Sequence, residues 1–162
     1  MLYNDEINLR KTATADLDYV IRTEQDSDNA PFIMQWPREK HEAAIHSADH
    51  LHLIVEHRHS GRRIGYVILA GLENPHNSIE LVRLTVASKG QGYGKSVLKL
   101  LRHWAFHEQR AHRLWLDVKE HNHRARHVYE SVGFVVEGKL RECLRCGDSY
   151  ESLIVMSMLA TD

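Results

Sequence analysis

A glycine-rich stretch near the middle of the chain carries the residue types that suit phosphate binding. It reads KGQGYGKS, from Lys89 to Ser96. A β-rich run precedes it, and a segment with helical spacing of apolar residues follows it. Glycines let an anion approach the backbone because they lack a Cβ, and the N–H groups and dipole of a helix start attract negative charge. We therefore predict that Gly90, Gly92 and Gly94 form a seat for a pyrophosphate.

Two common nucleotide-binding motifs do not fit this stretch. A Walker A loop ending in Gly94-Lys95-Ser96 needs a glycine at position 89, where the chain has Lys89. The dinucleotide pattern G-x-G-x-x-G needs a glycine at position 95 or 97, and the chain has Lys95 and Val97 there. A P-loop nucleotide binder stays as an alternative, for which Asp117 could supply the magnesium partner.

The pattern along the chain predicts a mixed sheet with helices on its faces. We expect strands over residues 6–12, 51–57, 62–72, 78–87 and 113–118, two more around the turn at Gly147-Asp148, and helices over 14–25, 37–48, 94–109 and 122–134. No linker or repeat divides the chain, so residues 1–162 are expected to form one domain.

The composition excludes several classes of function. Net charge is −1, which offers no electrostatic basis for binding nucleic acid or an anionic membrane. No apolar run approaches the roughly 18 residues of a membrane span, and the N-terminus lacks a signal-peptide core. The chain has only two cysteines, so we expect a cytoplasmic location. The 13 histidines are scattered and the pair Cys143 and Cys146 stands alone, so we expect no metal site.

Two segments of the chain resemble the GNAT N-acetyltransferase family. The loop pattern of that family, [QR]-x-x-G-x-[GA], falls on Lys89, Gly92 and Gly94, although Lys89 departs from the usual Gln or Arg. The segment NHRARHVYESVGF is similar to the family's N-x-x-A-x-x-x-Y-x-x-x-G-F, with matches at Asn122, Ala125, Tyr129, Gly133 and Phe134. The C-terminal segment resembles the branch of ribosomal-protein N-terminal and spermidine acetyltransferases.

The resemblance implies a fold, a co-substrate and a set of residues that bind it. It implies an α/β fold with a central mixed, mostly antiparallel sheet of about seven strands flanked by about four helices, and acetyl-CoA as co-substrate. Leu84, Thr85 and Val86 would pair with the pantetheine arm, and Asn122 would bind the coenzyme. The pyrophosphate would lie on the loop formed by Lys89, Gly90, Gln91, Gly92, Tyr93, Gly94, Lys95 and Ser96.

The resemblance also implies how an amine would be acetylated. An amine would attack the thioester directly in a ternary complex, with the Val86 N–H polarising the carbonyl. Tyr129 would be the acid, since a phenol can protonate a thiolate leaving group, and Glu80 would be the base. Glu151 and Asp117 are alternative bases.

The resemblance implies that the acceptor is a primary amine: a protein N-terminus, a polyamine or a small amine. Phe32 and Trp36 could line its pocket, together with Met34, or could pack in the core. Three acidic residues in this region could attract a cationic amine or belong to a solvated loop: Glu24, Asp26 and Asp28. A homodimer is possible. A non-catalytic acyl-CoA-binding module is the alternative function, because it would keep the loop without needing Tyr129 or Glu80.

Overall fold

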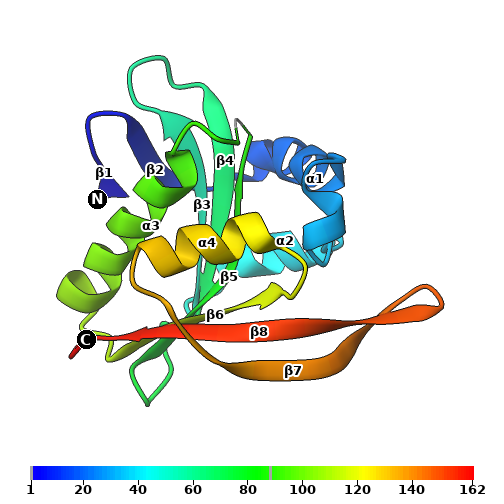
Figure 1. Cartoon of the computed structure of the whole chain (residues 1–162). Coiled ribbons are helices and arrows are strands. Elements are labelled where there is room, and N and C mark those ends of the chain that lie inside the picture. The colour runs from blue at the N-terminus through cyan, green and yellow to red at the C-terminus, as the bar shows by residue number, and fades with distance from the viewer. Residues whose placement is uncertain (1, 88) are drawn as a thin grey trace.

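A computed structural model of the chain describes residues 2–87 and 89–162 and has a central sheet as its main feature (Figure 1). Within this part of the chain, eight strands run in the order β1-β2-β3-β4-β5-β6-β8-β7. Their bounds are β1 Leu2–Tyr3, β2 Ile7–Lys11, β3 His50–His57, β4 Arg63–Ala70, β5 Ser78–Val86, β6 Arg113–Lys119, β7 Val135–Cys146 and β8 Ser149–Leu159. Neighbouring strands are antiparallel except β5 and β6, which are parallel. The predicted mixed α/β fold is confirmed, and the strand that the sequence did not predict is the short β1.

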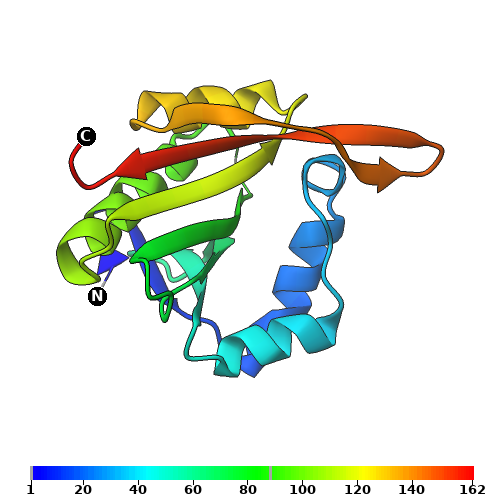
Figure 2. The ribbon, with the colours of Figure 1, turned by 90° about the horizontal axis from the view of Figure 1, so that it is seen from below.

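Helices cover both faces of the sheet (Figure 2). Their bounds are α1 Leu17–Gln25, α2 Arg38–His46, α3 Tyr93–His103 and α4 His123–Ser131, with 3-10 turns at Thr14–Asp16 and Ala30–Phe32 and a π-helical turn at Trp104–Glu108. Helices α3 and α4 lie on one face, and α1 and α2 lie on the other. None of the helices in residues 2–87 and 89–162 has the length and apolar character needed to span a membrane.

Each face buries its own set of apolar side chains. Val97, Leu98 and Leu101 recur at helical spacing on α3 and belong to one buried cluster with Leu114 and Leu116 of β6. On the other face, Val20 of α1 packs against Ile54, Tyr66 and Ile68. Both faces of the sheet centre are therefore buried, which explains the near-continuous apolar run in β4.

The two parallel strands separate after a short stretch of pairing. Only Ser78 to Glu80 of β5 pair with β6, opposite Arg113 to Trp115. Further along, the pairing of β5 with β4 shifts register at Val82, which is the pattern of a β-bulge. A bulge increases local twist, and here it accompanies the divergence of β5 from β6. The divergence leaves an opening between the C-terminal halves of these strands.

Candidate functional site

The opening between β5 and β6 is a large concave feature of the described residues. It is a groove with a volume of about 1520 Å³, and side chains from both faces of the sheet line it. Most of the predicted site residues line it: Phe32, Trp36, Glu80, Leu84, Thr85, Val86, Lys89, Gly90, Gly92, Tyr93, Gly94, Lys95, Asn122 and Tyr129. Gln91 and Ser96 do not. Ser96 accepts a hydrogen bond from Asn4 Nδ2 at 2.8 Å, so its hydroxyl is engaged with the N-terminal strands.

The end of β5 offers unpaired backbone groups to this groove. The Ala87 N–H donates to Ile64 O on β4, at 2.6 Å. Successive amides of a strand point to opposite edges, so the Val86 N–H points away from β4 and toward the opening. The Thr85 Oγ1 is buried and has no hydrogen-bond partner among the described residues. An extended ligand could therefore pair with this edge as an additional strand would.

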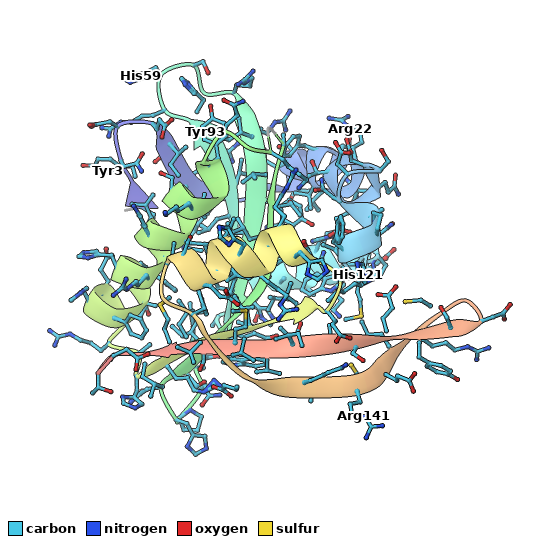
Figure 3. All side chains as sticks on the ribbon, in the orientation of Figure 1. Tyr3, Arg22, His59, Tyr93, His121 and Arg141 are labelled. Carbon is cyan, nitrogen blue, oxygen red and sulfur yellow. The ribbon has the colours of Figure 1, made fainter. Side chains whose placement is uncertain are left out.

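The glycine loop starts α3 in the way that anion binding requires. Gly92 is the N-cap of α3 and has φ of +79°, a conformation that glycine adopts without strain. Its neighbour Tyr93 begins the helix (Figure 3), whose first turn contains no acidic residue. Lys89 is half-buried at the groove, and burial together with the charge of Arg124 lowers its pKa. The loop is therefore a positively polarised helix start that faces the groove.

The two polar candidates of the α4 segment, Asn122 and Tyr129, have distinct surroundings. Asn122 Oδ1 accepts the Ala125 N–H at 3.2 Å, so Asn122 caps the start of α4. Tyr129 is half-buried, and its ring lies 5.7 Å from the ring of Phe134. Burial and the nearby Asp117 carboxylate raise the pKa of Tyr129 to about 12. The Tyr129 hydroxyl is therefore protonated at neutral pH.

Two carboxylates lie together in the groove, near the point where the strands part. Glu80 of β5 and Asp117 of β6 both line it, and neither forms an ion pair with a basic side chain in the described residues. Burial in the groove raises the pKa of both groups, and the Asp117 charge raises that of Glu80 further. The sequence pattern favoured Glu80 over Asp117. Asp117 stands between the buried Leu116 and Val118 in β6. Because side chains alternate along a strand, this pattern indicates that Asp117 lies on the other face of β6 from these two residues.

Glu151 lies outside the groove. Its Oε2 is 3.1 Å from Lys119 Nζ and 3.2 Å from His121 Nε2. It therefore forms an ion pair with Lys119 and contacts His121, and the structure does not bring it to the other candidate residues.

The segment between α1 and α2 forms one wall of the groove. Phe32, Met34 and Trp36 all line it, and Phe32 and Met34 are exposed. The Phe32 ring lies 5.5 Å from that of His121, which Figure 3 shows beside the start of α4. Lys119 Nζ donates to Pro31 O at 3.1 Å. This wall therefore reaches from α1 across to the end of β6.

The acidic residues of the same segment do not act together. Asp28 lines the groove, whereas Asp26 is exposed and does not line it. Glu24 is only 1% exposed and pairs with Arg83, so the prediction that it could attract an amine from solvent is wrong.

No group of three or more His, Cys, Asp or Glu side chains is arranged for a metal ion within residues 2–87 and 89–162. The cysteines are both free thiols: Cys143 is exposed, and Cys146 is partly exposed. A hydrogen bond with Glu151 and burial raise the pKa of the Cys146 thiol.

Comparisons with known proteins agree with this architecture. The sequence profile of the acetyltransferase (GNAT) family matches residues 18–134. The spermidine N(1)-acetyltransferase of Escherichia coli K12 is 28% identical over 159 residues, covering 93% of this chain and 84% of the relative. That of Vibrio cholerae is 25% identical over 167 residues, covering 96% and 94%.

Solved structures show the same fold. The spermidine N-acetyltransferase from Vibrio cholerae in complex with CoA and spermine has a TM-score of 0.86 at 23% identity, covering 98% of each chain. A dodecameric structure of that enzyme has a TM-score of 0.82 at 23% identity, covering 98% of this chain and 96% of the other. The groove, the glycine loop and the matched family profile together indicate that this enzyme uses acetyl-CoA as its co-substrate. The chain belongs to the acetyltransferase (GNAT) family and is an acetyl-CoA-dependent N-acetyltransferase.

Proposed function

We propose that this chain, as one domain over residues 1–162, acetylates a primary amine by direct attack on the thioester. The observation that supports this proposal most strongly is that Glu80, Asp117 and Tyr129 line one groove where β5 and β6 part. A reaction of this type needs a base for the amine, an acid for the thiolate and a fixed thioester between them.

The two unpaired carboxylates suit a cationic acceptor. Carboxylates that line a groove without a cation partner gain a favourable charge interaction when an ammonium binds beside them. Glu80 accepts a proton from the ammonium, and the free amine attacks the carbonyl carbon. Asp117 keeps its charge beside the nitrogen. The new N–C bond forms and gives a tetrahedral oxyanion. The nitrogen then releases its second proton to solvent, and the C–S bond breaks.

Two further groups act on the thioester. The Val86 N–H stabilises the oxyanion, because its amide faces the groove rather than β4. Tyr129 donates its proton to the departing CoA thiolate and recovers one from solvent. The pyrophosphate lies on Lys89, Gly92 and Gly94, and Asn122 contributes to binding the coenzyme arm.

Two acceptor classes have support. The Escherichia coli and Vibrio cholerae relatives are named for spermidine, which favours a polyamine. The wall formed by Phe32, Met34 and Trp36 is instead apolar and aromatic, which favours an amine attached to an apolar group. A protein N-terminus with an apolar first side chain belongs to this second class.

A homodimer is also proposed. The edge strand β7 exposes Val135, Val136 and Leu140, whose apolar side chains a second copy could cover. Sedimentation at micromolar concentration tests this, and a monomer at all concentrations would contradict it.

An acceptor screen tests the proposed function. The purified chain is mixed with acetyl-CoA and, in turn, spermidine, phenylethylamine and a peptide with a free N-terminus, and release of the CoA thiol is followed. The proposal expects thiol release that depends on at least one amine, with a mass gain of one acetyl group on that amine. Thiol release that no amine accelerates would overturn it. The ratio of kcat/KM for spermidine to that for phenylethylamine decides between the two acceptor classes.

A further inference from the structure

The segment that walls the acceptor side of the groove has no neighbouring strand to hold its backbone. Ile33 has extended backbone dihedrals, and Pro37 at the start of α2 does as well. No strand or helix includes residues 33–37 among the described residues. An extended segment of this kind needs partners for its N–H and C=O groups, and water would usually supply them.

A buried ion pair supplies these partners instead. Glu24 Oε2 accepts the Trp36 N–H at 3.0 Å, and Arg83 Nη2 donates to Met34 O. Arg83 Nη1 also donates to Glu24 Oε1 at 3.0 Å. Glu24 thus accepts from the peptide group that follows Gln35, and Arg83 donates to the peptide group that precedes it. A neighbouring strand would bind an extended segment through the same pair of groups.

The ion pair is itself fixed from several directions. Glu24 is 1% exposed and Arg83 is 7% exposed. Tyr66 Oη donates to Glu24 Oε1 at 3.0 Å, and His41 Nε2 lies 2.6 Å from the same oxygen. His41 Nδ1 in turn lies 3.0 Å from His52 Nε2. A buried charge held by this many partners keeps one geometry, because any displaced partner would be left unsatisfied.

The pair also connects the two halves of the groove. Arg83 lies on β5, immediately before Leu84, Thr85 and Val86, which line the coenzyme side. Glu24 lies on α1, on the opposite face of the sheet from α3 and α4. The same guanidinium therefore sets the position of the acceptor wall relative to the strand that presents the thioester.

From these contacts we infer that Glu24 and Arg83 are positioning residues for the acceptor: they hold Met34 and Trp36 at the distance from β5 that acceptor binding requires. This inference rests on the proposed function. Neither side chain touches the reacting atoms. Their removal therefore loosens the acceptor wall and leaves the coenzyme loop in place.

The test compares Glu24→Gln with a matched variant of a second ion pair, formed by Asp16 and Arg10. Asp16→Asn removes one of the two carboxylate partners of Arg10, whose Nη1 lies 2.8 Å from Asp16 Oδ2 and whose Nε lies 3.0 Å from Glu56 Oε2. Neither Asp16 nor Arg10 lines the groove. For Glu24→Gln we expect the KM for the amine to rise about tenfold or more, since a hydrogen bond to a charged group is lost. The KM for acetyl-CoA should stay within about twofold. Asp16→Asn should lower the thermal midpoint and leave both KM values unchanged.

A second measurement does not depend on turnover. Hydrogen exchange of the Trp36 amide, followed by mass spectrometry on a peptide covering residues 33–37, should become faster in Glu24→Gln and stay unchanged in Asp16→Asn. If Glu24→Gln does not fold, the double variant Glu24→Met with Arg83→Met removes both charges together, which buried pairs often tolerate. It should show the same faster exchange and the same rise in the KM for the amine.

Three outcomes would overturn the inference. These are unchanged exchange at Trp36, an unchanged KM for the amine in spite of faster exchange, and an equal rise in the KM for acetyl-CoA. Failure of the proposed function is distinguishable, because it shows in the unaltered chain as no turnover with any amine. Faster exchange in Glu24→Gln alone would then leave the ion pair as the support of the 33–37 backbone without a role in acetylation.

Discussion

Tyr129 has a pKa that the acceptor itself can change. The value of about 12 arises from burial and from the negative charge of Asp117. The CoA thiol has a pKa near 8.5. Because the pKa of Tyr129 in the empty groove is higher than this, Tyr129 donates its proton to the thiolate unfavourably. An ammonium bound between the two carboxylates would offset the Asp117 charge and lower the pKa of Tyr129. Acceptor binding would thus prepare the acid for the departure of the thiolate.

Replacing Tyr129 with phenylalanine should separate chemistry from binding. The ring and its packing against Phe134 remain, and only the proton donor is lost. We expect kcat to fall about a hundredfold or more, the usual contribution of a general acid. The Kd for CoA, measured by calorimetry, should change less than about threefold. A variant that keeps its kcat would remove Tyr129 from the mechanism.

The rising limb of the pH profile of kcat should report the two carboxylates. Burial and the Asp117 charge raise the pKa of Glu80 above its ordinary value of 4.5, so the basic form develops only above this raised pKa. Asp117→Asn removes the neighbouring negative charge. Without this charge the Glu80 carboxylate is more stable, so its pKa falls and the rising limb should move to lower pH. Glu80→Gln should abolish the limb. A limb that moves to higher pH in Asp117→Asn would contradict this coupling.

His52 should make the fold less stable in mild acid. It is buried beside His41, and burial together with the His41 charge lowers its pKa from 6.5 to about 4. The unfolded chain binds this proton more tightly, so the contribution of His52 to the free energy of unfolding is complete above pH 6.5 and falls as the pH is lowered toward 4. The loss should reach about 3 kcal/mol.

Urea unfolding at pH 7.5 and 5 should show about 2 kcal/mol of this loss, because pH 5 is still above the lowered pKa of His52. His52→Gln should be less stable than the unaltered chain at the higher pH, and its free energy of unfolding should depend less on pH. Equal pH dependence in the two proteins would show that other groups cause the loss.

At the scale of elements, the position of β5 depends on a glycine in β4. Gly65 lies opposite Val86, and a Cβ at this position would come within 2.1 Å of Thr85 O. The strands can approach this closely only because residue 65 has no side chain. The strand that presents the Val86 N–H is therefore set by its neighbour as well as by its own sequence.

Gly65→Ala should impair use of the coenzyme. The added methyl group must push the end of β5 away from β4 and move the Val86 N–H, and a shift of about 1 Å can cost roughly a hundredfold in rate. We expect kcat/KM for acetyl-CoA to fall at least about tenfold. Gly138→Ala in β7 is the control, because its Cβ would meet nothing within 4 Å. Equal activity of the two variants would show that β5 tolerates the displacement.

For the whole molecule, coenzyme binding should stabilise the fold. The groove is formed by residues from both halves of the sheet, so it exists only in the folded chain. A ligand at 100 times its Kd adds about 2.7 kcal/mol. For a chain of this length that corresponds to a thermal shift of roughly 5–10 °C. We expect this shift with acetyl-CoA and with CoA, and none with ATP and magnesium. A shift with ATP and magnesium alone would mean that Gly94-Lys95-Ser96 binds a nucleotide.

Local rules in the sequence were sufficient to predict the geometry of the glycine loop and of the start of α4. A strand, a glycine loop and a helix start are adjacent in the chain, and so are Asn122 and the helix that carries Tyr129. Their geometry follows from backbone preferences over a few residues, such as the positive φ of Gly92 and the cap at Asn122. The resemblance of these two segments to a known family was therefore enough to identify the co-substrate.

Which side chains meet at the proposed acceptor wall could be seen only in the folded chain. Asp117 meets Glu80 because β5 and β6 are neighbours in the sheet, although 37 positions separate them in the chain. Glu24 had the appearance of a loop carboxylate and instead lies buried with Arg83, 59 positions away. Burial and charge pairing depend on which distant segments come into contact, and a residue's type and its neighbours in sequence do not contain that information. Segments that are local in the chain were therefore enough to identify the co-substrate, whereas the shape of the groove beside the proposed acceptor wall depends on how α1 and α2 pack against the sheet.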